Sequence, residues 1–183
     1  MLLTWILIGV VAFVVLIFFW YYNRFATLEN RIENSLSQIN VQLKRRADLI
    51  PNLIEAVKGY MKHEKTIITS VNDARKALVS AGSVGEKIKA NDKLEGFLGR
   101  LFAIAENYPD LKANTNFLEL QRELSTTEDR VAYARQYFND SILTYNNLYA
   151  AFPGKFFAQL YKKEKKEYLQ ITEAEKKNVK VEF

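Results

Sequence analysis

Few side chains in this sequence have the types and spacing that acid–base or metal chemistry requires. His63 is the only histidine, and the chain contains no cysteine. A Ser-His-Asp triad would have to use this histidine, and zinc sites built from two histidines or from thiolates cannot form. The pair His63-Glu64 also lacks the second histidine of a metalloprotease helix. We interpret His63 as a structural or surface residue, and we expect neither a metal nor a cofactor.

Carboxylates gather in one stretch, at Glu119, Glu123, Glu128 and Asp129. Such residues could form an acid–base couple, but these lie on a predicted helix among basic neighbours, where solvated ion pairs are the more common arrangement. The sequence also has no glycine-rich loop that could bind phosphate. It therefore indicates no catalytic, cofactor-binding or metal-binding residue, and we predict that the protein is not an enzyme.

The most basic stretch is Lys44-Arg45-Arg46, within QLKRRADLIPNL at residues 42–53. A basic cluster could bind nucleic acid, but this one is short, it is followed by Asp48, and no nucleic-acid-binding module surrounds it. The net charge of +5 comes from 26 basic and 21 acidic residues that are interspersed. We predict a solvated surface of mixed charge and no nucleic-acid partner.

An apolar segment near the amino terminus, residues 2–22, contains no charged residue. As a helix it would span about 30 Å, the thickness of a bilayer core. Trp5 and Trp20 lie near its ends, where aromatic rings prefer the headgroup region. The alternative, a cleavable signal peptide, lacks a basic region before the apolar run and a small-residue cleavage site after it. We predict a transmembrane anchor at residues 1–23 that contacts the bilayer through residues 2–22.

Basic residues follow this apolar segment, whereas none precedes it. Arg24 and Arg31 come first, and the basic triplet comes next. The positive-inside rule then predicts a single-pass protein of the cell membrane, with its amino terminus outside and the domain at residues 24–183 in the cytoplasm.

Long helices are favoured by the scarcity of turn residues, with seven glycines and three prolines in 183 residues. Alternating steps of four and three from Ile32 to Leu78 meet apolar residues at every position except Arg46 and Glu64. This seam predicts one helix from the membrane to about residue 79, ended by SAGSVG at residues 80–85. Pro51 predicts a kink near residues 47–51. Alternatively, Arg46 extends to solvent and Pro51 only bends the helix around its core.

Three further helical segments follow. One covers residues 86–107 and ends at ENYPDLKAN, residues 106–114; another carries aromatic and aliphatic residues every seven positions from Phe117 to Phe152. The last begins near Phe156 and becomes rich in lysine and glutamate, before an extended or frayed NVKVEF ending. The predicted fold is all-α, a transmembrane helix continuing into an antiparallel bundle of about four long helices. In that arrangement the turn at residues 106–114 would lie near the basic triplet, and Glu106 or Asp110 would pair with Arg45 or Arg46.

The chain resembles the LemA family of bacterial membrane proteins. The resemblance lies in VQLKRRADLIPNLIEAVKGYMKHE at residues 41–64, ENYPDLKAN at 106–114 and TTEDRVAYARQYFNDSILTYN at 126–146. With the apolar segment and the VKVEF ending, it covers nearly the whole chain, although Ala47 stands where relatives often carry an aromatic residue. The resemblance implies a single-pass anchor and long packed helices. It implies no reaction, and some members are associated with membrane proteases or intracellular membrane compartments.

Two functions are compatible with these observations. In the first, the protein is a membrane-anchored helical scaffold or interaction protein, which binds a protein partner or a second copy of itself and assists a membrane protein complex or membrane organisation. In the second, it is an unrecognised enzyme or an accessory subunit of a membrane protease. The lysine-rich tail is either a solvated helix face or a segment attracted to anionic lipid. The absence of a catalytic constellation favours the scaffold.

Overall fold

The computed structural model describes residues 1–169. The helices in this range are α1 (Leu2–Lys58), α2 (Lys65–Ser80), α3 (Val84–Ala105), α4 (Pro109–Lys112), α5 (Thr115–Ala150) and α6 (Gly154–Leu160). The described residues contain no strand. The predicted all-α class, with a long apolar amino-terminal helix followed by packed helices, is confirmed. The NVKVEF ending lies outside the described residues.

The chain forms two compact units, and both α1 and α5 contribute to each of them. The first unit contains residues 1–35 and the part of the chain from residue 136 onward, and the second contains residues 36–135. The predicted boundary between anchor and domain, at residue 23, lies inside the first unit and stays a prediction.

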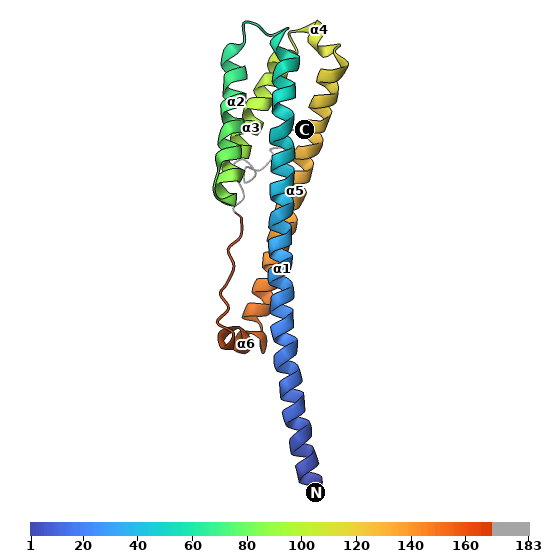
Figure 1. Cartoon of the computed structure of the whole chain (residues 1–183), viewed down its shortest axis with the longest axis vertical. Coiled ribbons are helices and arrows are strands. Elements are labelled where there is room, and N and C mark those ends of the chain that lie inside the picture. The colour runs from blue at the N-terminus through green and yellow to red at the C-terminus, as the bar shows by residue number, and fades with distance from the viewer. Residues whose placement is uncertain (170–183) are drawn as a thin grey trace, which may run out of the picture. The chain divides into compact units, whose positions relative to one another are not determined.

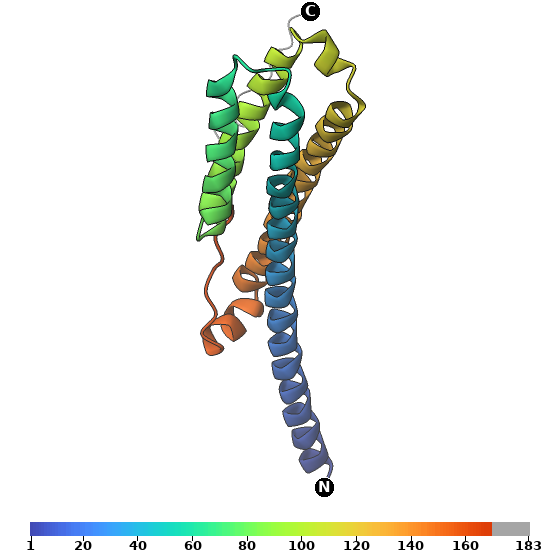
Figure 2. The ribbon, with the colours of Figure 1, turned by 45° about the horizontal axis from the view of Figure 1, so that its top comes forward.

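The second unit is an antiparallel arrangement of α1, α2, α3 and the first half of α5 (Figure 1; Figure 2). Contacts at its two ends show the directions of the helices. At one end, Asn114 Nδ2 donates to Tyr60 Oη at 3.3 Å, and at the other Lys87 Nζ donates to Asn40 Oδ1 at 2.9 Å. The core between the helices is aliphatic and includes Ile50, Leu94 and Leu124.

The first helix ends earlier than the apolar seam predicts. α1 stops at Lys58, and α2 begins at Lys65 and runs back along it, so the prediction of one helix to residue 79 is wrong. The six intervening residues keep the apolar spacing in phase: Val57 on α1 and Ile67 on α2 are both buried, although they belong to different helices. A helical hairpin with a turn of this length leaves the same apolar pattern as one continuous helix.

The turn between α2 and α3 lies in the predicted SAGSVG stretch. The Ser83 hydroxyl accepts from the backbone N–H of Glu86, and the Glu86 carboxylate accepts from the backbone N–H of Ser83. This reciprocal capping box satisfies free donors at the start of α3. Hydrogen bonds from the backbone N–H groups of Ser83 and Gly82 lower the pKa of the Glu86 carboxyl.

The first unit has an aromatic core formed by α1, the end of α5 and α6. Phe25 and Tyr145 are fully buried, and their rings meet edge to face with centroids 5.7 Å apart. Gly154 begins α6 next to the backbone of Leu148, and a side-chain carbon at this position would overlap the Leu148 carbonyl. Glycine is therefore needed where α6 turns back against the end of α5.

The chain does not continue as a helix after α6, so the predicted lysine- and glutamate-rich helix ends at Leu160 within the described residues. Two asparagines of α5 hold the following segment by its backbone. Asn146 donates to the Lys166 carbonyl and accepts from the Lys166 N–H, and Asn139 makes the same pair of hydrogen bonds with Leu169. Asn139 and Asn146 are two helical turns apart on α5, which is about 10 Å along the helix axis. Lys166 and Leu169 are three residues apart in an extended segment, which is also about 10 Å. The two pairs of hydrogen bonds can therefore form at the same time.

Candidate functional site

The basic triplet on α1 is the chemically most distinctive feature of the second unit. Its three side chains have different surroundings. Lys44 Nζ pairs with Asp48 Oδ2 on the same helix at 2.9 Å, and Arg45 Nη2 pairs with Glu123 Oε2 of α5 at 2.8 Å. Arg46 points into the bundle and is only 1% exposed. The predicted inward position of Arg46 is confirmed, and the alternative in which it reaches solvent is wrong.

The Arg46 guanidinium contacts two other helices. Its Nη1 atom donates to Asn91 Oδ1 of α3 at 3.1 Å and lies 3.6 Å from Glu95 Oε2. Its Nη2 atom donates to Glu128 Oε2 of α5 at 3.4 Å. The buried Nε atom has no hydrogen-bond partner among the described residues. One side chain of α1 thus joins α3 and α5 at a single point in the core.

The predicted partners of the arginines are wrong. Glu106 pairs with Lys112, at the end of the bundle next to the turn between α1 and α2. In the same region, Tyr108 Oη donates to Glu64 Oε1 at 3.4 Å. The prediction fails because α2 folds back along α1. This places the segment at residues 106–114 beside residues 60–64 rather than beside the basic triplet.

Glu95 and Glu128 are half-exposed carboxylates that share the Arg46 guanidinium. Partial burial raises the pKa of the Glu128 carboxyl, and the neighbouring Glu95 carboxylate raises it further, whereas Arg46 acts in the opposite direction. Both carboxylates contact Arg46, so they partly compensate its buried positive charge.

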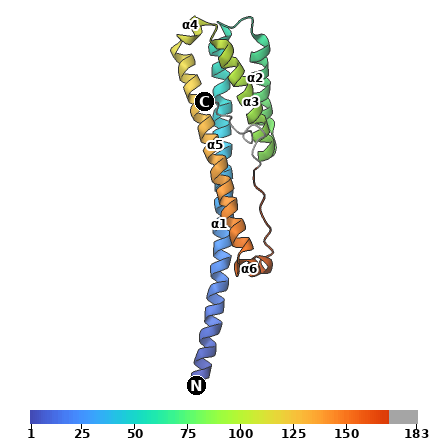
Figure 3. The same cartoon turned by 180° about the vertical axis from the view of Figure 1, so that it is seen from behind.

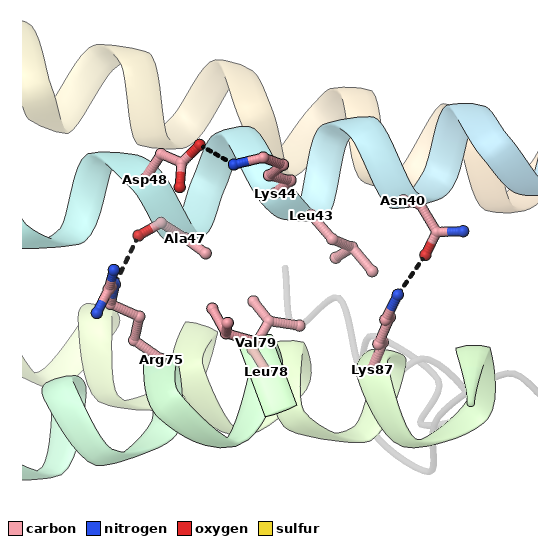
Figure 4. Close-up of a pocket in the computed structure, with 9 residues that line it drawn as sticks. All are labelled: Asn40, Leu43, Lys44, Ala47, Asp48, Arg75, Leu78, Val79 and Lys87. Atoms are coloured by element: carbon pink, nitrogen blue, oxygen red, sulfur yellow. Dashed lines mark hydrogen bonds and ion pairs between the residues drawn. The ribbon is translucent and has the colours of Figure 1, made fainter. Parts of the chain in front are cut away.

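A cavity of about 340 Å³ lies on another side of the same stretch of α1, between α1, α2 and α3 (Figure 4). Its lining consists of Asn40, Leu43, Lys44, Ala47, Asp48, Arg75, Leu78, Val79 and Lys87. The charged and amide groups in this lining are bonded to one another or to the backbone, and Leu43, Leu78 and Val79 contribute an apolar surface.

Arg75 satisfies a backbone group that Pro51 leaves without its helical donor. Proline has no N–H, so the carbonyl of Ala47, four residues earlier in α1, loses its usual hydrogen bond. Arg75 Nε of α2 donates to this carbonyl at 2.9 Å (Figure 4). α1 continues through Pro51 without ending. The proline therefore creates a specific attachment point for α2 on α1.

The other residues considered from the sequence lie apart. His63 is exposed in the turn after α1, which confirms its interpretation as a surface residue, and Glu119 and Asp129 are exposed on α5. Glu123 and Glu128 contact different arginines. Sequence reasoning missed Asn91, Glu95 and Arg75. Asn91 and Glu95 are four apart on α3, and a polar residue within an apolar helix face was the available signal for Asn91.

No group of three or more histidine, cysteine, aspartate or glutamate side chains suited to a metal ion occurs among residues 1–169. The contacts around the basic triplet join α1 to α3 and α5.

We expect Arg46→Ala to lower the free energy of unfolding by about 3 kcal/mol, because it removes a buried charge from its partners and leaves a void. Arg45→Ala is the matched control on the neighbouring residue, and loss of its exposed pair with Glu123 should cost about 0.2–1 kcal/mol. Urea unfolding of the detergent-solubilised chain measures both. Equal costs for the two variants would contradict the role given to Arg46.

Arg75→Ala should cost about 1–3 kcal/mol, since it leaves the Ala47 carbonyl unpaired. In a Pro51→Ala background the cost should be smaller, because the substituted alanine supplies the helical N–H that proline lacks. A double-mutant cycle measures this coupling. Lys76→Ala, on the exposed neighbour of Arg75, should change stability by at most about 0.5 kcal/mol in either background. The same Arg75→Ala cost with and without Pro51 would refute the link between the two residues.

Comparisons with known proteins agree with the resemblance. Magnetosome protein MamQ of Magnetospirillum gryphiswaldense is 28% identical over 165 residues, covering 76% of this chain and 61% of the relative. Magnetosome protein MamQ 2 of Paramagnetospirillum magneticum is 26% identical over 189 residues, covering 89% and 69%. Protein LemA of Metamycoplasma hominis is 26% identical over 130 residues, covering 70% and 56%. The chain thus spans about three fifths of the length of the first of these relatives.

The relatives and the apolar segment of α1 together support a membrane location. A sequence model of the LemA family matches residues 35–183, which is most of the chain. The chain belongs to the LemA family.

Proposed function

We propose that the protein is a membrane-anchored helical scaffold, whose helical domain binds another membrane protein or a second copy of the chain. The observation that carries this proposal is the use of polar groups at the candidate site. Arg45, Arg46 and Arg75 each bind another helix of the same bundle. These groups stabilise a shape, and no observation among residues 1–169 favours the alternative of an enzyme or a protease accessory subunit.

The anchor in this proposal is the apolar part of α1, residues 2–22. Its most apolar window has a mean hydropathy of 3.0 and is not buried within the protein. A surface of this length and composition is stable in a bilayer and unfavourable in water. The relatives named as magnetosome proteins support a role at a membrane. We infer that residues 2–22 cross the bilayer once.

The orientation follows from the basic residues after the anchor. Arg24 and Arg31 lie within ten residues of its end, and such positions favour the cytoplasmic side. We infer an outside amino terminus and a cytoplasmic helical domain.

Introduced cysteines test this orientation, because the chain has none of its own. A membrane-impermeant maleimide applied to intact cells should leave Ser83→Cys unmodified until the cells are permeabilised. Labelling of Ser83→Cys in intact cells would show that the domain lies outside.

Exposed apolar side chains on α5 offer a surface for the partner. Leu118 and Tyr133 are both exposed in the second unit. They are 15 residues apart, so they project from similar sides of the helix, about four turns from each other. A scaffold needs such a surface, because burial of apolar area drives most protein association.

A photoreactive phenylalanine analogue at Tyr133 should give a discrete cross-linked product in living cells, with the anchor intact. The same analogue at Lys76, an exposed position on α2, is the control and should give little product. Mass spectrometry of the product then identifies the partner or a second copy. Absence of any product from Tyr133 would argue against the scaffold.

A further inference from the structure

α6 packs against the last turns of the apolar segment of α1 (Figure 3). The rings of Tyr21 and Phe157 stack with centroids 4.5 Å apart, and Tyr161 Oη donates to the backbone carbonyl of Phe18 at 2.6 Å. Phe157 and Ala158 are buried in the same cluster as Phe25. The position of α6 along α1 is therefore determined by direct contacts within the first unit.

The same short element exposes large apolar side chains. Phe152, in the turn before α6, is 91% exposed, and Phe156 and Leu160 on the helix are 60% and 53% exposed. Phe156 and Leu160 are four residues apart, which places them on one face of the helix. α6 has seven residues and buries Phe157 on one side. Its other apolar side chains form a second surface that residues 1–169 do not cover.

The level of α6 relative to the bilayer follows from its contacts. Phe18 and Tyr21 belong to residues 2–22, and a helix of this length just spans a hydrocarbon core of about 30 Å. Any element that packs on residues 18–21 consequently lies at the boundary of the core with the headgroups. The exposed side chains of α6 are thus continuous with the membrane-spanning surface of α1.

Basic side chains accompany the apolar ones. Lys155 is exposed in the first turn of α6, and Lys162 is exposed two residues after its end. Arg24 is exposed on α1 one turn after Tyr21. The nearest acidic residue after α6, Glu164, is also exposed, but cations outnumber acids between residues 154 and 169 by five to two. Apolar residues flanked by cations are typical of segments that lie in the interface of an anionic membrane.

We propose that α6 and the turn before it form a second membrane contact, with Phe152, Phe156 and Leu160 inserted into the leaflet from which α1 emerges and Lys155 and Lys162 near anionic phospholipid headgroups. The occupant of this surface is the bilayer. The proposal rests on the proposed anchoring of residues 2–22 and extends it from one helix to a helix plus an interfacial element. This second contact would limit rotation and tilt of α1 relative to the membrane.

The test uses the full chain reconstituted into vesicles of phosphatidylcholine and phosphatidylglycerol. Single cysteines carry an environment-sensitive fluorophore at Leu16, Leu143 or Phe156, and nitroxide-labelled lipid serves as the quencher. Leu16 lies within the apolar segment, and Leu143 is a matched apolar control on α5, 47% exposed in the same unit as α6. We expect quenching at residues 16 and 156 and little quenching at residue 143. Quenching at residue 156 should be strongest when the nitroxide is attached to the lipid near its headgroup.

The outcomes separate the two proposals. No quenching at residue 16 would refute the anchor itself. Quenching at residue 16 without quenching at residue 156 would overturn the second contact while leaving the anchor in place. In that case, blue-shifted emission at residue 156 would show that protein rather than lipid covers the exposed surface of α6. Circular dichroism of each labelled variant checks that it remains folded.

The headgroup contact has its own readout. Omission of phosphatidylglycerol should reduce quenching at residue 156 and leave quenching at residue 16 unchanged. In a variant that combines Lys155→Gln and Lys162→Gln, quenching at residue 156 should be the same with and without phosphatidylglycerol. Quenching at residue 156 that is independent of anionic lipid would refute the role of the lysines.

Discussion

A charge in the apolar core constrains the whole second unit. The Arg46 guanidinium is almost fully buried, and an isolated buried charge costs several kcal/mol unless other groups surround it. Its partners come from α3 and α5, at Asn91, Glu95 and Glu128. Apolar packing alone allows helices to slide or rotate with modest loss. Hydrogen bonds and ion pairs to one guanidinium are more specific, and they select one register of the three helices.

The neighbouring turn of α1 carries a complementary constraint. Pro51 leaves the Ala47 carbonyl without its helical donor, and Arg75 of α2 supplies the missing hydrogen bond. A hydrogen bond that is missing within α1 is thereby replaced by one between α1 and α2. Arg46 joins α1 to α3 and α5 while Arg75 joins it to α2, so residues 46–51 contact every other long helix of this unit.

The first unit uses different physical means. Stacking of Tyr21 on Phe157 attaches α6 to α1, and the edge-to-face contact of Phe25 with Tyr145 attaches α5 to α1. Burial raises the pKa of the Tyr145 hydroxyl to about 12, with a further contribution from Glu29. Asn139 and Asn146 then hold an extended segment by its backbone, which places no requirement on the side chains of that segment. Consecutive turns of α1 therefore carry the contacts of both α6 and α5 in this unit.

The sequence by itself determined the helical class, the apolar segment, the family and the inward position of Arg46, because each of these depends on composition, on spacing or on a local motif. It could not determine where α1 ends, since the turn at residues 59–64 keeps the apolar pattern in phase. The partners of Arg46 and Arg75 were likewise decided only by tertiary structure. Several acidic side chains and several backbone carbonyls could have accepted hydrogen bonds from these arginines. Which of them do so depends on which helices fold back beside α1.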